Sequence, residues 1–142
     1  MDESYCTYKL DMSKAYNRVD WVFLEKFLLK MGFNKQWVNW GMISVTTVRY
    51  RVKINGELTE IFSPARGLRQ GDPLSPYLIL FVGQALSLVL DRAVYLGELH
   101  DQKICRKALG ISHLLFANDS LIFFKAKVEQ AGVIKKPYLS MS

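Results

Sequence analysis

Residues 113–124 of the chain read His113-Leu-Leu-Phe-Ala-Asn-Asp-Ser-Leu-Ile-Phe-Phe124, a short polar tip between two strongly apolar runs. Apolar runs on either side of a tight turn are typical of a β-hairpin. We therefore expect strands over 111–116 and 121–125, around a turn at Ala117-Asn118-Asp119-Ser120. Asn and Asp are common in such turns for conformational reasons alone, so the tip by itself does not identify a functional site.

The segments before this hairpin predict one strand and two helices. Residues 5–11 read as a short strand that ends in a carboxylate. From Trp21 the apolar residues follow helical spacing, and Gly32 is placed to end that helix. Asn34 can cap a second helix that ends at about Ser44.

A hairpin, a loop and a long helix follow. Residues 50–54 alternate between apolar and basic side chains, and Asn55-Gly56 supplies a type I′ turn before the return strand. The stretch 63–76 is rich in Gly and Pro and predicts a loop, and a helix is expected over about 75–96. Its apolar part is too short and too interrupted for a membrane span, which favours a buried helix and no membrane partner.

The order of these elements predicts an α+β fold. Helices would cover one face of a small, mainly antiparallel sheet, and the tail after Lys127 adds weak helical character. A chain of 142 residues that is half hydrophobic can bury such a core as one domain. Cys6 and Cys105 lie far apart in no pair motif, which favours two reduced thiols in an intracellular protein.

The charge favours a polyanionic partner without identifying one. Lys and Arg outnumber Asp and Glu by 19 to 13, which gives a net charge of +6. The N-terminus has no basic region followed by an apolar run, which argues against a secretory signal. Lys135-Lys136 is too short to count as a nuclear signal, so these residues leave localisation open.

A second polar segment reads Lys9-Leu-Asp-Met-Ser-Lys-Ala-Tyr-Asn-Arg-Val-Asp-Trp21. Asp11 follows a strand and precedes a helix, a position common in folds that bind a metal or a phosphate. The same position is equally common for a helix cap, and for this segment alone the cap is the favoured interpretation.

A third segment reads Ala65-Arg-Gly-Leu-Arg-Gln-Gly-Asp-Pro-Leu-Ser-Pro76. Its two glycines let the backbone approach a ligand closely, and Arg66 and Arg69 can meet phosphate. In isolation, a helix lead-in capped by Ser75 explains the segment equally well, and solvated loop side chains are the favoured interpretation of the two arginines.

Together, the three segments resemble motifs A, B and C of reverse transcriptases of plant LINE-type (non-LTR) retrotransposons. In that family, motif A reads Asp-Met-Ser-Lys-Ala-Tyr-Asp-Arg-Val-Glu-Trp, motif B contains Gly-Leu-Arg-Gln-Gly-Asp-Pro-Leu-Ser-Pro, and motif C reads Phe-Ala-Asp-Asp. The resemblance runs from about Tyr8 to Phe124 and includes the Asn55-Gly56 hairpin. It implies a polymerase palm fold.

The resemblance also implies a two-metal DNA polymerase that uses Mg²⁺, or Mn²⁺ in its place, with an RNA template, a DNA primer and deoxynucleoside triphosphates. Asp11 and Asp119 match metal ligands of motifs A and C. Tyr16 matches the aromatic residue that crowds the ribose 2′-hydroxyl and so selects deoxyribose. Gln70 and Gly71 match the turn that contacts the incoming nucleotide and the template.

Two residues depart from the family pattern. Asn118 stands at the third metal-ligand position, where motif C has its first Asp. Two unit charges about 4 Å apart interact by about 4 kcal/mol at an effective dielectric of about 20. Losing one charge therefore predicts roughly a thousandfold weaker metal binding or rate, and little or no polymerase activity. Asn17 replaces another Asp outside the metal set, and the two changes together suggest a decayed element copy.

We therefore expect residues 1–142 to be a partial reverse transcriptase domain, the palm region, with the fingers and thumb largely absent. Those parts would be needed from elsewhere to hold primer and template firmly. The family acts on chromosomal DNA, which suggests the nucleus. The alternatives are a non-catalytic module that binds nucleic acid, and a decayed copy with no retained function.

Overall fold

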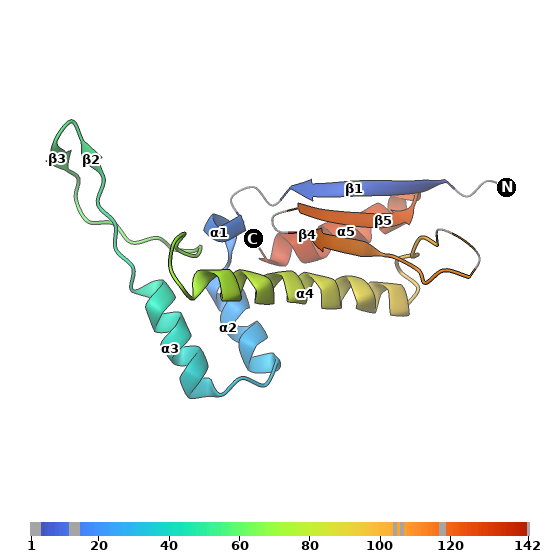
Figure 1. Ribbon diagram of the computed structural model, residues 1–142, viewed down its shortest axis with the longest axis horizontal. Coiled ribbons are helices and arrows are strands. Elements are labelled where there is room, and N and C mark those ends of the chain that lie inside the picture. Colours follow the sequence, from blue (N-terminus) through green and yellow to red (C-terminus); the bar gives the residue numbers. More distant parts are fainter. Residues whose placement is uncertain (1–3, 12–14, 104, 106, 117–118, 142) are drawn as a thin grey trace.

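The computed structural model describes residues 4–11, 15–103, 105, 107–116 and 119–141. Figure 1 shows a small sheet with helices packed beneath it and a thin hairpin that projects from one end. The elements in chain order are β1 (Tyr5–Asp11), α1 (Ala15–Arg18), α2 (Trp21–Lys30), α3 (Lys35–Thr46), β2 (Lys53–Ile54), β3 (Glu57–Leu58), α4 (Ser75–Tyr95), β4 (His113–Phe116), β5 (Asp119–Lys125) and α5 (Val128–Met141). The predicted α+β class is confirmed.

The main sheet has three antiparallel strands in the order β1-β5-β4, so β5 lies in the centre. Along β5, every second residue is buried: Ser120, Ile122 and Phe124. Alternate side chains of a strand point to opposite faces, so these three residues define the inner face of the sheet. Asp119 begins the same strand on the outer face.

A first hydrophobic core lies between that inner face and the helices α4 and α5. Ile122 and Phe124 pack there with Leu86 and Leu90 of α4 and with Ile134 of α5. Both helices therefore cover the same side of the sheet, as the sequence predicts. Figure 1 shows α4 running along the sheet, with α5 behind the strands.

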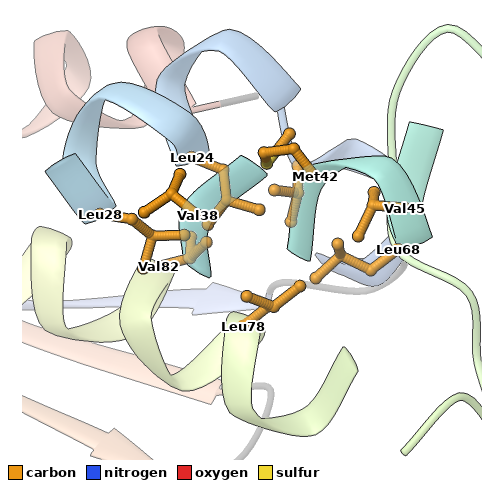
Figure 2. Close-up of a cluster of buried hydrophobic side chains, with 9 residues drawn as sticks. Leu24, Leu28, Val38, Met42, Val45, Leu68, Leu78 and Val82 are labelled. Carbon is orange, nitrogen blue, oxygen red and sulfur yellow. The ribbon is translucent and has the colours of Figure 1, made fainter. Parts of the chain in front are cut away.

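A second core joins α4 to the pair α2 and α3. Its buried side chains, most of which Figure 2 labels, are Val19, Leu24, Leu28, Val38, Met42, Val45, Leu68, Leu78 and Val82. Leu24 is 0% exposed and Leu28 is 1% exposed. Truncating such a residue to Ala costs about 2–5 kcal/mol in the free energy of unfolding. This second core therefore contributes much of the stability that holds α2 and α3 against α4.

Helix α4 belongs to both cores, which is why it is long and apolar. Its length and composition would also suit a membrane span, so the expectation that it is too short and too interrupted for one is wrong, although core helices of soluble proteins share this property. One face is buried, as the sequence predicts, through residues such as Leu78 and Leu90. The prediction is wrong for the other face, where Tyr77 and Leu80 are 63% and 70% exposed.

Local signals in the sequence explain how α2 and α3 begin and end. The side chain of Asp20 accepts a hydrogen bond from the backbone N–H of Phe23 at 2.7 Å and caps α2. Gly32 follows that helix with a φ of +91°, a conformation that glycine adopts without strain. Asn34 caps α3 by accepting from the backbone N–H of Gln36, which confirms its predicted role.

The structure departs from the sequence-based expectations at four points. The turn before β5 is shorter than predicted, because Asp119 and Ser120 already pair with β1 and β4. Ser75 is not a cap: it is the first residue of α4 and is buried, and Asp72 accepts from the backbone N–H of Leu74 instead. The short helix α1 has no counterpart in the sequence prediction. Asp11 lies in β1, so the cap interpretation gains no support.

The predicted Asn-Gly hairpin is present but short. Asn55 and Gly56 both have positive φ, +50° and +94°, as a type I′ turn requires. Only two residues on each side form the ladder, and a separate bridge pairs Tyr50 with Phe62. The hairpin extends away from both cores in Figure 1, and its strands are exposed.

Candidate functional site

Strand pairing brings two predicted site residues together from opposite ends of the chain. Asp11 ends β1, Asp119 begins β5, and the two are direct partners in the antiparallel register. Directly opposed positions share one face of a sheet, with Cβ atoms typically about 4.5–5.5 Å apart. Asn118, the third residue of the predicted set, lies outside the residues that the structure describes.

A basic side chain lies at the same place. The Lys9 ammonium nitrogen is 3.1 Å from a carboxylate oxygen of Asp119, and the two side chains are 61% and 45% exposed. Exposed pairs of this kind contribute at most about 1 kcal/mol, so the contact can be exchanged for another cation. The sequence did not predict this contact of Lys9, because the contact depends on strand register. The usable signal was that Lys9 lies two residues before Asp11, which places both positions on the same face of a strand.

A second set of contacts joins the segment after β1 to the loop before α4. The Gly67 N–H donates to the carbonyl of Val19 at 2.9 Å, and the Leu68 N–H donates to the carbonyl of Tyr16 at 2.5 Å. The indole N–H of Trp21 donates to the carbonyl of Gly67 at 2.7 Å. We call this set of contacts the 16–21/67–68 joint. It fixes the loop that carries the predicted motif B.

The two glycines of that loop differ in their surroundings. Gly67 and Gly71 have φ values of +94° and +85°, which disfavour other residues. A Cβ on Gly67 would lie 2.9 Å from the carbonyl oxygen of Asn17 and 3.0 Å from that of Tyr16. A Cβ on Gly71 would meet no described atom within 4 Å. Gly67 therefore serves the joint, and Gly71 leaves open space where a ligand can approach.

The remaining predicted residues lie around the joint. Tyr16 is half-buried against the second core, whereas Gln70, Arg66 and Arg69 are exposed. Both arginines line a hollow of about 240 Å³ between the loop and the end of α3, together with Asn17. The structure thus brings part of the predicted motif A, around Tyr16, beside the predicted motif B loop.

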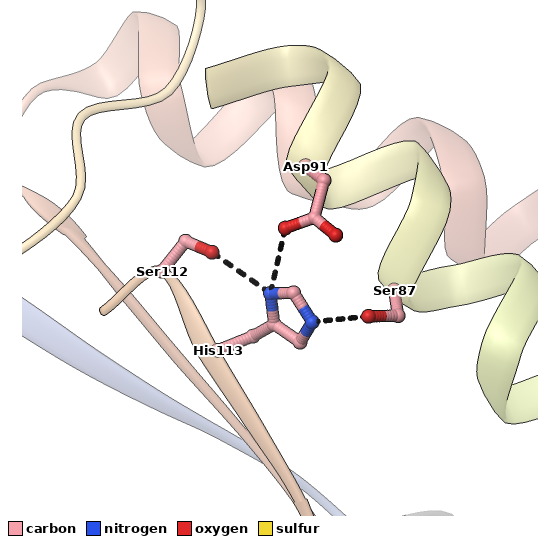
Figure 3. A network of polar contacts seen from close by, with 4 residues as sticks. All are labelled: Ser87, Asp91, Ser112 and His113. Atoms are coloured by element: carbon pink, nitrogen blue, oxygen red, sulfur yellow. Dashed lines mark hydrogen bonds and ion pairs between the residues drawn. The ribbon is translucent and has the colours of Figure 1, made fainter. Parts of the chain in front are cut away.

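His113 forms a polar network between β4 and α4 that the sequence analysis did not identify. Its Nε2 is 2.6 Å from the Ser87 hydroxyl, and its Nδ1 is 2.8 Å from the Ser112 hydroxyl and 4.0 Å from Asp91 (Figure 3). Burial lowers the pKa of His113 below its usual 6.5, and the carboxylate of Asp91 opposes this shift only in part. A histidine within an apolar strand was the available signal.

The register opposes two residues of acidic type, Asp11 and Asp119, at this end of the sheet. Carboxylate oxygens are the ligands that Mg²⁺ and Mn²⁺ prefer. Within the described ranges, no group of three or more His, Cys, Asp or Glu residues gathers in the manner of a metal site. Asp11 and Asp119 remain the predicted ligands, and the register opposes their backbone positions.

Comparisons with known proteins bear on the family of the chain as a whole. The family described as "Reverse transcriptase (RNA-dependent DNA polymerase)" matches residues 1–137. An uncharacterized mitochondrial protein of Arabidopsis thaliana is 45% identical over 67 residues, which are 47% of this chain and 55% of that protein. The transposon TX1 uncharacterized 149 kDa protein of Xenopus laevis is 35% identical over 107 residues. That match covers 67% of this chain, which spans only 8% of the transposon protein.

Proposed function

Since the chain belongs to the reverse transcriptase (RNA-dependent DNA polymerase) family, we propose that it is the palm portion of a non-LTR retrotransposon polymerase with a weakened catalytic site. Members of this family bind nucleic acid templates and deoxynucleoside triphosphates and use divalent metals in general. The register that opposes Asp11 to Asp119 is the single observation that carries the proposal for the site.

Asp11 and Asp119 are the residues that would hold the metal ions. When bound, two divalent ions would supply charge stabilisation for the attacking and leaving oxygens as a primer 3′-hydroxyl displaces pyrophosphate from a nucleoside triphosphate. The role of the protein is to present hard oxygen ligands at a fixed spacing. Opposed positions in neighbouring strands do this without a further loop, because the sheet itself sets their separation.

Asn118 makes this site weaker than that of an intact family member. Its amide oxygen can coordinate a hard cation but brings no negative charge. By the Coulomb estimate above, one missing charge near the ions costs about 4 kcal/mol, or roughly a thousandfold in metal binding or rate. We therefore propose an impaired polymerase site on a palm scaffold.

The residues around the 16–21/67–68 joint would position the nucleotide. Tyr16 would crowd the ribose 2′-hydroxyl, and its backbone carbonyl is held by the Leu68 N–H. Gln70 and Gly71 would contact the incoming nucleotide and template, which the open space at Gly71 supports.

Phosphate contacts would come from the same loop. Arg66 and Arg69 are exposed beside the hollow, where guanidinium groups can meet phosphate oxygens. Fingers and thumb regions, supplied from elsewhere, would make the remaining contacts with primer and template.

Primer extension with the native chain and its Asn118→Asp variant tests the catalytic proposal. Saturating primer–template compensates for the weak primer–template binding that the sequence predicts, and both proteins are assayed at the same Mn²⁺ concentration, below saturation of the native chain. We expect the variant to extend primers roughly a thousandfold faster than the native chain. Equal rates in the two proteins would contradict the role assigned to Asn118.

A second candidate function is nucleic-acid binding without chemistry. The net charge of +6 and the exposed Arg66 and Arg69 favour it. Binding through phosphate contacts weakens steeply with salt. If this function is the retained one, Asp11→Ala will leave both the affinity for single-stranded RNA and its salt dependence unchanged.

A further inference from the structure

An apolar groove with a basic rim lies between α2 and α4. Its volume is about 480 Å³, and its described lining residues are the apolar Phe23, Phe27, Met31, Ala85, Leu88 and Val89 and the basic Lys26, Lys30 and Arg92. The described residues that line it include no carboxylate. The groove therefore combines apolar area with a single sign of charge.

The floor of the groove is preformed and open to solvent. The rings of Phe23 and Phe27 lie nearly parallel, with centroids 6.1 Å apart. Met31 and Leu88 are each 44% exposed, and Val89 is 40% exposed. Covering such side chains removes apolar surface from water, which favours association with a partly apolar partner.

The rim charges are available for a partner. Lys26 and Lys30 lie one helical turn apart on α2, and Arg92 faces the groove from α4. In the described parts of the chain, none of these three side chains pairs with a carboxylate within 4.0 Å. Opposite charge on a partner would therefore meet basic groups that are not already neutralised.

The groove is separate from the candidate polymerase site. Helix α4 packs on the inner face of the sheet, against Ile122 and Phe124, whereas Asp119 lies on the outer face. A nucleic acid that reaches the carboxylates over the outer face would leave this groove free.

We propose that the α2–α4 groove docks an amphipathic helix that carries carboxylates beside its apolar face. The apolar floor accepts aliphatic anchors, and the rim pairs with the carboxylates, as in helix-in-groove recognition. From Phe23 to Met31 the groove follows α2 for about 12 Å, enough for roughly two turns of a docked helix. A phosphate backbone would satisfy the rim but would leave most of the floor facing water.

A synthetic helical peptide tests the proposal. The probe has leucines at helical spacing on one face and glutamates flanking them, and a matched peptide has glutamine at every glutamate position. Fluorescence anisotropy measures binding of each peptide, and of a single-stranded RNA of similar length, to the 142-residue chain. We expect the acidic peptide to bind at least tenfold more tightly than the glutamine peptide.

Charge reversal locates the binding. Lys26→Glu combined with Lys30→Glu is expected to weaken acidic-peptide binding at least tenfold. Arg51→Glu combined with Lys53→Glu makes the same change of charge on the exposed hairpin, and we expect it to alter binding by less than twofold. Circular dichroism melting checks that both variants fold.

Three results would overturn the proposal. The first is no saturable binding of the acidic peptide to the native chain, and the second is equal loss of binding in the two charge-reversal variants. The third is RNA binding that only the Lys26/Lys30 reversal abolishes, together with weak peptide binding. That third result would assign the groove to nucleic acid.

Discussion

The 16–21/67–68 joint and the Asp11/Asp119 end of the sheet belong to one proposed site, but different interactions hold them. At the joint, two backbone hydrogen bonds and one from the Trp21 indole hold a glycine in a space that admits no side chain. At the sheet end, strand pairing sets the positions, and the described side-chain contact is the exposed Lys9–Asp119 pair. The joint is thus fixed by backbone contacts, while the half-exposed Asp119 can change with little effect on folding.

Replacing Gly67 with Ala should have the largest effect on stability. The left-handed φ costs about 1–2 kcal/mol, and overlap with the backbone of residues 16–17 adds about 1–3 kcal/mol. Gly71→Ala is the matched control, because Gly71 also has a left-handed φ but has open space around it. We expect the control to lose only about 1–2 kcal/mol in urea unfolding. Equal losses would remove the distinction between the joint and the open loop.

Trp21→Phe should have the next largest effect. It removes the donor to the Gly67 carbonyl, and we expect a loss of about 1–2 kcal/mol in the free energy of unfolding. Trp40→Phe removes an indole that is 61% exposed on α3 and should stay within about 0.5 kcal/mol of the native chain. Similar losses for both variants would mean that ring packing, rather than the hydrogen bond, explains the Trp21 effect.

The network at His113 predicts a pH effect on stability. Because burial holds its pKa below the unfolded value of 6.5, the unfolded chain binds the proton more readily. The contribution of this residue is therefore intact above about pH 6.5 and is lost as pH falls from there through the folded pKa. The slope from one such group cannot exceed about 1.4 kcal/mol per pH unit. His113→Gln should flatten this part of the profile measured by urea unfolding, and an unchanged slope would contradict the assignment.

Lys9→Met should give the smallest effect, a change in Mn²⁺ affinity. It tests whether Lys9 competes with a metal ion for Asp119. Removing an exposed ammonium group that competes for Asp119 should increase Mn²⁺ affinity by up to about fivefold. Lys53→Met is the control, since it removes a charge from the exposed hairpin. A decrease in affinity for Lys9→Met would show that Lys9 supports the metal site rather than competing with it.

The sequence predicted elements whose signals are local. Strand β1, the caps at Asn34 and Gly32 and the Asn55-Gly56 turn depend on short-range preferences, and all are present. The apolar length of α4 predicted the helix but not its exposed face, because helical spacing alone does not say how many neighbours cover it.

The site was harder to predict where it depends on long-range contacts. The joint links Trp21 to Gly67 across 46 residues, and no local pattern indicates that Gly67 faces backbone rather than a ligand. The Lys9–Asp119 pair required the strand register. By contrast, the resemblance to motifs A and C predicted that Asp11 and Asp119 lie close together, and the register places them opposite each other.

Electron paramagnetic resonance of Mn²⁺ tests most directly whether this scaffold retains a carboxylate metal site. The same titration tests whether Asn118 lowers the metal affinity of that site. The native chain, Asn118→Asp and Asn118→Asp combined with Asp11→Ala would be titrated, with circular dichroism confirming that all three fold. We predict roughly thousandfold tighter binding by Asn118→Asp than by the native chain, and loss of that gain when Asp11 is also replaced. Equal binding by the native chain and Asn118→Asp, or a gain that survives Asp11→Ala, would contradict this assignment of the metal site.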